Sequence, residues 1–326
     1  MTLTPRFPDL TILTTGLTTV LSGNSGSSPG VTVIEREPLN TTQTHPSEVV
    51  RCRMADGAEQ LLLCKYGDRI SSVHGSHGHR RGVPYEAMVY ERLLRPAGAQ
   101  VPPWWGAYVD QHQRTWLVIG FLDGGLKISK VERSDFRTTI SLAAQWIAQF
   151  QNAVEAPALA EVRAALITYD EEYYSGWAQR TLALAQAVES VEPWLAAVVD
   201  RYVQSVIPQL LAHPTVIHGE FYPANVLSWR GGVYPLDWES TAVGAGEIDL
   251  ACLLEGWAPS VATPAFESYR RDRIRPEGAP ELGRALDAAR LYMQFRWLGD
   301  EREWRIDDPR WRFERVRDLA NRLGLL

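Results

Sequence analysis

The chain has 326 residues, of which 45% are hydrophobic and 22% are charged, a composition that excludes a wholly disordered protein. Because this length exceeds the size at which a single hydrophobic core stops growing, it predicts two domains or lobes. The formal net charge is −6, from 33 basic and 39 acidic residues, which disfavours a general nucleic-acid binder and tolerates a cationic small substrate.

The cysteines and the N-terminal residues bear on the compartment. Cys52, Cys64 and Cys252 show neither a disulfide framework nor the spacing of a zinc site, which favours a reducing environment. Residues 1–13 lack a basic start followed by a long apolar run, and no apolar stretch approaches the length of a membrane span. We therefore expect a cytoplasmic protein with no membrane partner.

Residues 1–122 are predicted to form strands joined by turns. The segments rich in β-branched or alternating residues are 31–34, 48–54, 60–66 and 116–119. Residues 84–94 change to a helical period and carry Pro84 at a tolerated start position. The Ser/Gly-rich stretch 22–30 is predicted to be a flexible surface loop.

Residues 123–326 are predicted to be mainly helical. Amphipathic helices are expected over 140–154, 180–189, 193–211, 284–298 and 310–323. A β-rich island, residues 216–236, interrupts them. A strand-rich first lobe followed by a helical second lobe predicts an α+β fold, with ligands binding in a cleft where the lobes join.

The strongest chemical signal lies in residues 218–239. They begin with His-Gly-Glu, carry Asn225 in the middle and end with Asp237-Trp238-Glu239. Two short apolar segments flank the turn at Gly231 and Gly232, which predicts a hairpin with polar residues at its ends. Glu220, Asn225 and Asp237 can therefore converge on one side of this hairpin.

This segment resembles the catalytic loop of aminoglycoside phosphotransferases and related choline or homoserine kinase-like enzymes. Their pattern is His-Gly-Asp, four residues, Asn, then a short hairpin and a metal-binding Asp. Residues 244–251, Gly-Ala-Gly-Glu-Ile-Asp-Leu-Ala, resemble the continuation of that pattern. The likeness is specific over residues 216–251, and elsewhere it is one of layout.

The resemblance implies a two-lobed protein kinase-like fold, with an antiparallel sheet in the nucleotide-binding lobe and a helical catalytic and acceptor-binding lobe. It implies transfer of the γ-phosphate of ATP or GTP to a hydroxyl of a small molecule, such as an aminosugar, amino alcohol or antibiotic. Mg²⁺ prefers oxygen ligands, which Asn225 and Asp237 supply. Glu220 is then the carboxylate that orients the acceptor hydroxyl and takes its proton.

Two neighbours of this motif are expected to be supports rather than reacting groups. The ring of His218 can hydrogen-bond loop backbone and hold Glu220 in place. Asp249 is expected near a helix start, where a carboxylate can cap N–H groups, and by resemblance it also braces the catalytic loop.

Position 220 departs from the family, because it is Glu where the pattern has Asp. The added methylene displaces the carboxylate, and such misplacement can slow a reaction about a hundredfold. Proton removal is, however, a modest part of loose phosphoryl transfer. We therefore predict an active enzyme, and the alternative is a catalytically weak, pseudokinase-like nucleotide-binding protein.

Upstream residues fit the same layout. Lys65 follows an apolar strand, as the nucleotide-binding Lys does in kinase-like folds, and Glu86 resembles the helix Glu that pairs with it. The alternative is that both side chains face solvent. Backbone groups of Gly120, Phe121 and Leu122 are predicted to form the hinge that binds the nucleotide base.

The loop that covers the phosphates is less defined. No G-x-x-x-x-G-K-[ST] run exists, which disfavours a P-loop enzyme. The turn over residues 40–47 lacks glycines and is either a phosphate-capping loop or a polar hairpin turn. A protein kinase is disfavoured because little chain separates Asp237 from the next predicted helix.

Three further groups have two interpretations each. His74, His77 and His79 are predicted to lie in a mobile loop rather than in a metal site. Residues 170–174 and 300–304 are acidic and aromatic, and they are either acceptor contacts or solvated helix faces. A monomer or a homodimer is expected.

Overall fold

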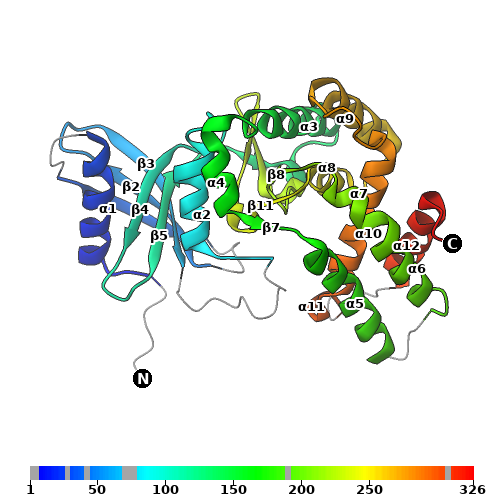
Figure 1. The fold of residues 1–326 in the computed structure, drawn as a ribbon. Coiled ribbons are helices and arrows are strands. Elements are labelled where there is room, and N and C mark those ends of the chain that lie inside the picture. The colour runs from blue at the N-terminus through cyan, green and yellow to red at the C-terminus, as the bar shows by residue number, and fades with distance from the viewer. Residues whose placement is uncertain (1–6, 26–29, 40–44, 68–78, 188–191, 305–309) are drawn as a thin grey trace. The chain divides into compact units, whose positions relative to one another are not determined.

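The computed structural model describes residues 7–25, 30–39, 45–67, 79–187, 192–304 and 310–326 (Figure 1). The chain forms two compact units. Unit 1 comprises residues 1–73, 79–126 and 227–240, and unit 2 comprises residues 74–78, 127–226 and 241–326.

Unit 1 contains a five-stranded antiparallel sheet in the order β1-β2-β3-β5-β4. Its strands are β1 (Thr32–Pro38), β2 (Ser47–Arg53), β3 (Glu59–Gly67), β4 (Trp104–Val109) and β5 (Thr115–Gly120). Alternation of polar and apolar residues along β2 and β3 directs Val50, Cys52, Leu62 and Cys64 into one buried layer. The strands predicted from the sequence in this region are confirmed, and β4 was not predicted.

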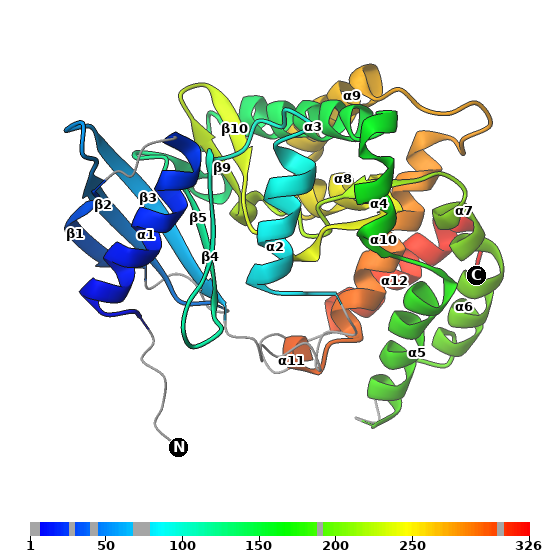
Figure 2. The same cartoon turned by 60° about the vertical axis from the view of Figure 1, so that its left-hand side comes forward.

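A helix that the sequence did not reveal, α1 (Leu10–Ser25), lies against this sheet in Figure 2. Its residues Leu13, Leu17 and Val20 are buried in the same hydrophobic cluster as the sheet side chains. The prediction of a flexible loop over 22–30 is wrong for residues 22–25, and residues 26–29 lie outside the described part. The helix is rich in threonines, which are poor helix formers, and Thr14, Thr15 and Thr19 each donate a hydroxyl hydrogen bond to the carbonyl four residues earlier.

Two more elements of unit 1 position the site. α2 (Val83–Val89) begins after Gly82, whose φ of 77° suits glycine, and continues as a π-helical turn over Tyr90–Leu94. β9 (Val226–Trp229) and β10 (Gly232–Pro235) form the predicted hairpin, with β6 (Leu126–Lys127) as the third strand of that sheet. Arg230 and Gly231 both have positive φ, 48° and 78°, as the favoured two-residue hairpin turn requires.

The division into units differs from the boundary expected between residues 122 and 123. Unit 1 extends to Leu126 and also takes in the hairpin Leu227–Ser240, which the sequence had assigned to the second lobe. The hairpin belongs to unit 1 because Trp229 donates its indole N–H to Asp123 O at 2.7 Å and Asp237 pairs with Lys65.

Unit 2 is mainly helical and also contains a three-stranded sheet. In that sheet, β11 (Ala242–Ala245) pairs parallel with β7 (Ile167–Thr168) and antiparallel with β8 (Pro214–Ile217). The helices are α3 (Phe136–Ala153), α4 (Ala160–Ala165), α5 (Glu171–Ala187), α6 (Leu195–Arg201), α7 (Ile207–Leu211), α8 (Glu247–Leu254), α9 (Pro259–Asp272), α10 (Leu282–Leu298), α11 (Glu301–Trp304) and α12 (Arg310–Leu323). The helices predicted from the sequence are present, although the one expected over 193–211 is α6, a π-helical turn (Tyr202–Val206) and α7.

α10 is the central helix of unit 2. It packs against α5, α8 and α12, and most of its side chains are buried. One of these buried residues, Arg296, is charged.

In the parts of the chain that the structure describes, no helix is both long enough and apolar enough to cross a membrane.

Candidate functional site

Lys65 joins two carboxylates in unit 1. Its Nζ lies 2.7 Å from Glu86 Oε2 and 2.5 Å from Asp237 Oδ1. The side chains of Lys65 and Glu86 are 12% and 2% exposed, whereas that of Asp237 is 37% exposed. The predicted pairing of Lys65 with Glu86 is therefore present, and the alternative of two solvent-facing side chains is wrong.

The charges explain why this buried lysine stays protonated. Burial opposes the ammonium charge, but Asp237 and Glu86 outweigh it and raise the pKa of Lys65 above its usual range. Glu86 also accepts a hydrogen bond from Trp238 N at 3.2 Å through its other oxygen. One glutamate of α2 thus holds both the lysine of β3 and the backbone that follows Asp237.

Asp237 has a backbone conformation that is unusual for a residue with a side chain. Its φ is 67°, in the left-handed region, which Asp tolerates better than most residues. Such conformations persist where the surrounding contacts fix them, and they concentrate at functional sites. Here the ion pair with Lys65 and the hydrogen bond from Trp238 N to Glu86 hold the residue on either side of the Asp237 carbonyl.

Glu239 and His45 are neighbours that the sequence did not identify. Their side chains are buried, with His45 Nε2 3.3 Å from Glu239 Oε2. Glu239 adds to the negative charge around Lys65. The one feature of the sequence that could have identified Glu239 is its position, two residues after the predicted metal ligand Asp237. Residues 40–44 of the predicted phosphate loop lie outside the described part.

The predicted catalytic loop of unit 2 is held by backbone hydrogen bonds. Asp249 of α8 accepts from His218 N at 2.8 Å and from Gly219 N at 2.9 Å. Glu220 N donates to His218 Nδ1 at 3.3 Å, and Asn225 Nδ2 donates to Glu220 O at 3.0 Å. These bonds fix the backbone of Glu220 on both sides.

The structural roles expected of two residues are thereby refined. His218 holds the loop through its ring, as predicted. Asp249 braces the loop but does not cap its own helix, since α8 begins after Gly246 without a side-chain cap. Burial raises the pKa of Asp249 to about 7, although the two N–H donors oppose this shift.

The carboxylate of Glu220 meets a cation that the sequence analysis missed. Arg296 Nη1 lies 3.3 Å from Glu220 Oε1, and Arg296 Nη2 donates to the Tyr222 hydroxyl. The side chains of Arg296 and Glu220 are 9% and 5% exposed. The signal in the sequence was an arginine among large apolar residues, in Phe295-Arg296-Trp297-Leu298.

Several backbone groups of the predicted hinge form hydrogen bonds with other backbone groups of unit 1. Gly120 N donates to Pro103 O at 2.8 Å, Phe121 N to Leu61 O at 2.9 Å, and Gly125 N to Leu122 O at 2.9 Å. These hydrogen bonds continue the sheet and close a turn. Contact between a nucleotide base and other backbone groups of Gly120, Phe121 and Leu122 stays a prediction.

Residues 170–174, which are candidate acceptor contacts, mostly support the fold. Asp170 accepts from Tyr173 N at 2.8 Å at the start of α5, and Tyr173 and Tyr174 are buried beside Tyr169 and Tyr292. His74 and His77 lie outside the described residues. Among the residues that are described, no group of three or more His, Cys, Asp and Glu could hold a metal ion.

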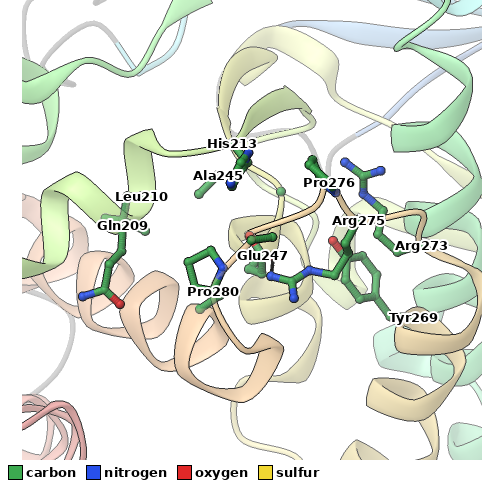
Figure 3. A pocket seen from close by; sticks show the side chains of 13 residues that line it. Gln209, Leu210, His213, Ala245, Glu247, Tyr269, Arg273, Arg275, Pro276 and Pro280 are labelled. Carbon is green, nitrogen blue, oxygen red and sulfur yellow. Dashed lines mark hydrogen bonds and ion pairs between the residues drawn. The ribbon is translucent and has the colours of Figure 1, made fainter.

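Unit 2 also has a pocket away from these residues, shown in Figure 3. Arg275 Nη2 lies 3.2 Å from Glu247 Oε1 within it, so the two charges offset each other. None of the predicted site residues lines this pocket, whose other labelled residues include His213, Tyr269 and Arg273.

The arrangement of strands and helices matches solved structures along almost the whole chain. The GDP complex of wild-type aminoglycoside 2'-phosphotransferase-IIIa aligns with a TM-score of 0.58 at 14% identity, covering 95% of this chain and 99% of that one. Macrolide 2'-phosphotransferase MphH from Brachybacterium faecium aligns with a TM-score of 0.57 at 18% identity, covering 93% and 98%. The chain has the fold of these phosphotransferases.

A third solved structure also aligns along almost the whole chain. Choline kinase LicA from Streptococcus pneumoniae aligns with a TM-score of 0.56 at 13% identity, covering 95% of this chain and 98% of that one. No family model and no curated protein matches the sequence. These alignments establish the two-lobed kinase-like α+β fold. Because the sequence identities are low, they do not establish the activity, which has to be argued from the site.

Proposed function

We propose that this protein is a magnesium- and nucleotide-dependent phosphotransferase, which moves the γ-phosphate of ATP or GTP to a hydroxyl of a small molecule. The observation that carries the proposal is the contact of Lys65 with both Glu86 and Asp237. In enzymes of kinase-like fold, the lysine of the third strand, paired with a helix glutamate, binds nucleotide phosphates, and an aspartate binds the metal.

The lysine is prepared for an anionic ligand. Glu86 is almost fully buried and fixes one side of the ammonium, whereas Asp237 is partly exposed. A bound nucleotide would bring phosphate oxygens to Lys65 and compete with Asp237 for it. Asp237 would then be available to a cation.

Each of the two proposed Mg²⁺ ligands offers an oxygen donor. Asp237 offers a partly exposed carboxylate. The amide N–H of Asn225 is used by Glu220 O, so its Oδ1 is the atom left to act as a ligand. Both are the hard oxygen donors that Mg²⁺ prefers, and few protein ligands suffice because phosphates supply others. When bound, the ion would neutralise phosphate charge during transfer.

Glu220 is proposed to orient the acceptor hydroxyl and accept its proton. The loop is held by Asp249, His218 and Asn225, which supports accurate placement of this carboxylate. The structural neighbours are named for aminoglycosides, macrolides and choline, so an aminosugar, amino alcohol or antibiotic acceptor is proposed as a class. We also propose a cytoplasmic location, in keeping with three free, buried cysteines.

One observation favours a second candidate, a catalytically weak, pseudokinase-like nucleotide-binding protein. Position 220 carries Glu, and its carboxylate is already paired with Arg296. In that case Mg²⁺–nucleotide would bind through Lys65 and Asp237 without turnover.

A screen of acceptor-dependent nucleotide consumption separates the two candidates. Purified protein with Mg²⁺ and ATP or GTP is tested against aminoglycosides, macrolides, amino alcohols and aminosugars. The phosphotransferase predicts nucleoside diphosphate release that requires one acceptor class and is lost in Asp237→Ala. Asp56→Ala, in an exposed turn of the same unit, is the control and should retain the activity. Nucleotide binding without consumption for any acceptor would favour the pseudokinase-like protein.

A further inference from the structure

Arg296 is placed to act on the predicted catalytic carboxylate from a different element. It belongs to α10, and Glu220 belongs to the loop after β8. Its Nη1 is 3.3 Å from Glu220 Oε1, and its Nη2 donates to the Tyr222 hydroxyl. One guanidinium therefore holds two side chains of the catalytic loop.

The surroundings of Arg296 favour its ion pair with Glu220. The guanidinium carbon lies 5.9 Å from the Tyr222 ring centre and 6.0 Å from that of Trp297. Burial opposes its charge, but Tyr222 and Glu220 raise the pKa of Arg296 well above its usual range, so it stays protonated. A buried cation without a partner is strongly unfavourable, which ties Arg296 to Glu220.

The loop backbone explains why the side chain at position 220 needs its length. Glu220 N and O are bonded to His218 Nδ1 and Asn225 Nδ2, and Asp249 holds the two preceding N–H groups. The Cα of residue 220 is therefore fixed independently of its carboxylate. The ion pair at 3.3 Å is already longer than a typical charged hydrogen bond, so a side chain shorter by one methylene would lose it.

We propose that Arg296 is a positioning residue for phosphoryl transfer, which fixes the direction of the Glu220 carboxylate, and that glutamate occupies this position because it reaches Arg296. This inference rests on the proposed function. Loose phosphoryl transfer depends mainly on orientation, so a carboxylate held by a cation can still direct an acceptor hydroxyl. Arginine suits this role because its planar donors impose a direction.

The kinetic test compares Arg296→Met and Arg296→Lys with a matched control on the same helix. Arg290 also lies on α10, and it forms an ion pair of 3.3 Å with Asp287 of that helix. Arg296→Met should lower kcat about a hundredfold and change the nucleotide KM by less than about threefold. Arg296→Lys should restore part of kcat, and Arg290→Met should leave it unchanged. Equal kcat values for Arg296→Met and Arg290→Met, or an increase in Arg296→Met, would overturn the proposal.

A stability cycle tests the contact without any need for turnover. Urea midpoints are measured for wild type, Arg296→Met, Glu220→Gln and the double variant. Each single variant should have a lower midpoint than wild type because it removes one partner of a buried ion pair, and the double variant should lose less than the sum of the two single losses. If Arg296→Met does not fold, Arg296→Lys replaces it in the same cycle.

The kinetic and stability experiments together distinguish a failure of the positioning proposal from a failure of the proposed function. Additive midpoints would refute the contact between Arg296 and Glu220, whatever the activity. Coupled midpoints in a protein that transfers phosphate to no acceptor would refute the proposed function and the positioning role that depends on it, while the contact itself would stand.

Discussion

Glu220 differs by one methylene from the aspartate found in the family that the sequence resembles, and its surroundings are fitted to that extra length. Its backbone is held by His218 and Asn225, and its carboxylate reaches Arg296 of α10. The substitution is therefore accompanied by a partner for the longer side chain.

At this residue we predict that restoring the family pattern lowers activity. Glu220→Asp should reduce kcat by roughly tenfold to a hundredfold, because the carboxylate would withdraw from Arg296 and from the acceptor. Glu220→Gln should lose more, because it removes the negative charge and the proton acceptor. Turnover of the three proteins with one acceptor gives the comparison. A Gln variant as active as wild type would show that residue 220 is not a base.

Asp249 predicts a pH effect on stability. Burial raises the pKa of Asp249 to about 7 in the folded protein, above that of a carboxyl in the unfolded chain. The folded state then binds more protons between about pH 4 and pH 7, so the Asp249 contribution becomes less favourable as pH rises through that window.

The measurement is the free energy of unfolding of wild type and Asp249→Asn at several pH values. Between about pH 5 and pH 8 the advantage of wild type over the Asn variant should shrink by roughly 1–3 kcal/mol. A difference that is constant, or that grows with pH, would contradict the raised pKa and indicate that the N–H donors dominate.

At the scale of elements, local patterns predicted the strands of unit 1 better than they predicted the packing of its N-terminal helix. Alternation and turn residues located β2, β3, β5 and the hairpin β9–β10. α1 was missed because its threonines and two glycines mask a helical pattern that packing against the sheet stabilises. Arg296 was missed because α10 contacts the predicted catalytic loop across about 75 residues of sequence, which no local pattern encodes.

The docking of α1 gives a stability prediction. A Cβ at Gly16 would lie 2.4 Å from Trp116 Cζ3 and 3.0 Å from Tyr108 Cδ1. Alanine favours helix, but the overlap should dominate and destabilise Gly16→Ala by roughly 1–3 kcal/mol. Gly30→Ala is the control, since a Cβ added there would meet no atom within 4 Å beyond its chain neighbours. A chemical denaturation curve for each decides this, and a more stable Gly16→Ala would refute the packing of α1.

At the scale of the whole molecule, the predicted site of unit 1 combines residues that are far apart in the chain. Unit 1 takes Asp237 from the segment Leu227–Ser240, more than a hundred residues after Leu126. The single boundary expected from the sequence reflected the order of strands and helices. The ion pair between Lys65 and Asp237 is a long-range contact that composition and periodicity do not report.

This arrangement predicts how nucleotide changes stability. Mg²⁺–nucleotide that binds Lys65 and Asp237 in the folded state should stabilise that state and therefore raise Tm. At a free nucleotide concentration of a hundred times Kd, the stabilisation is about 2.7 kcal/mol. Asp237→Ala should abolish the magnesium-dependent part of the shift, whereas Asp56→Ala should keep it. A thermal melt with nucleotide, with and without Mg²⁺, is the test, and an unchanged shift in Asp237→Ala would remove Asp237 as a metal ligand.

The most direct test of the account is transfer of label from a nucleotide labelled at the γ-phosphate to an acceptor identified in the screen. Phosphotransfer predicts labelled product in amounts equal to the nucleoside diphosphate formed, with none in Asp237→Ala. Bound nucleotide that yields neither labelled acceptor nor acceptor-dependent diphosphate would contradict the proposed phosphotransferase.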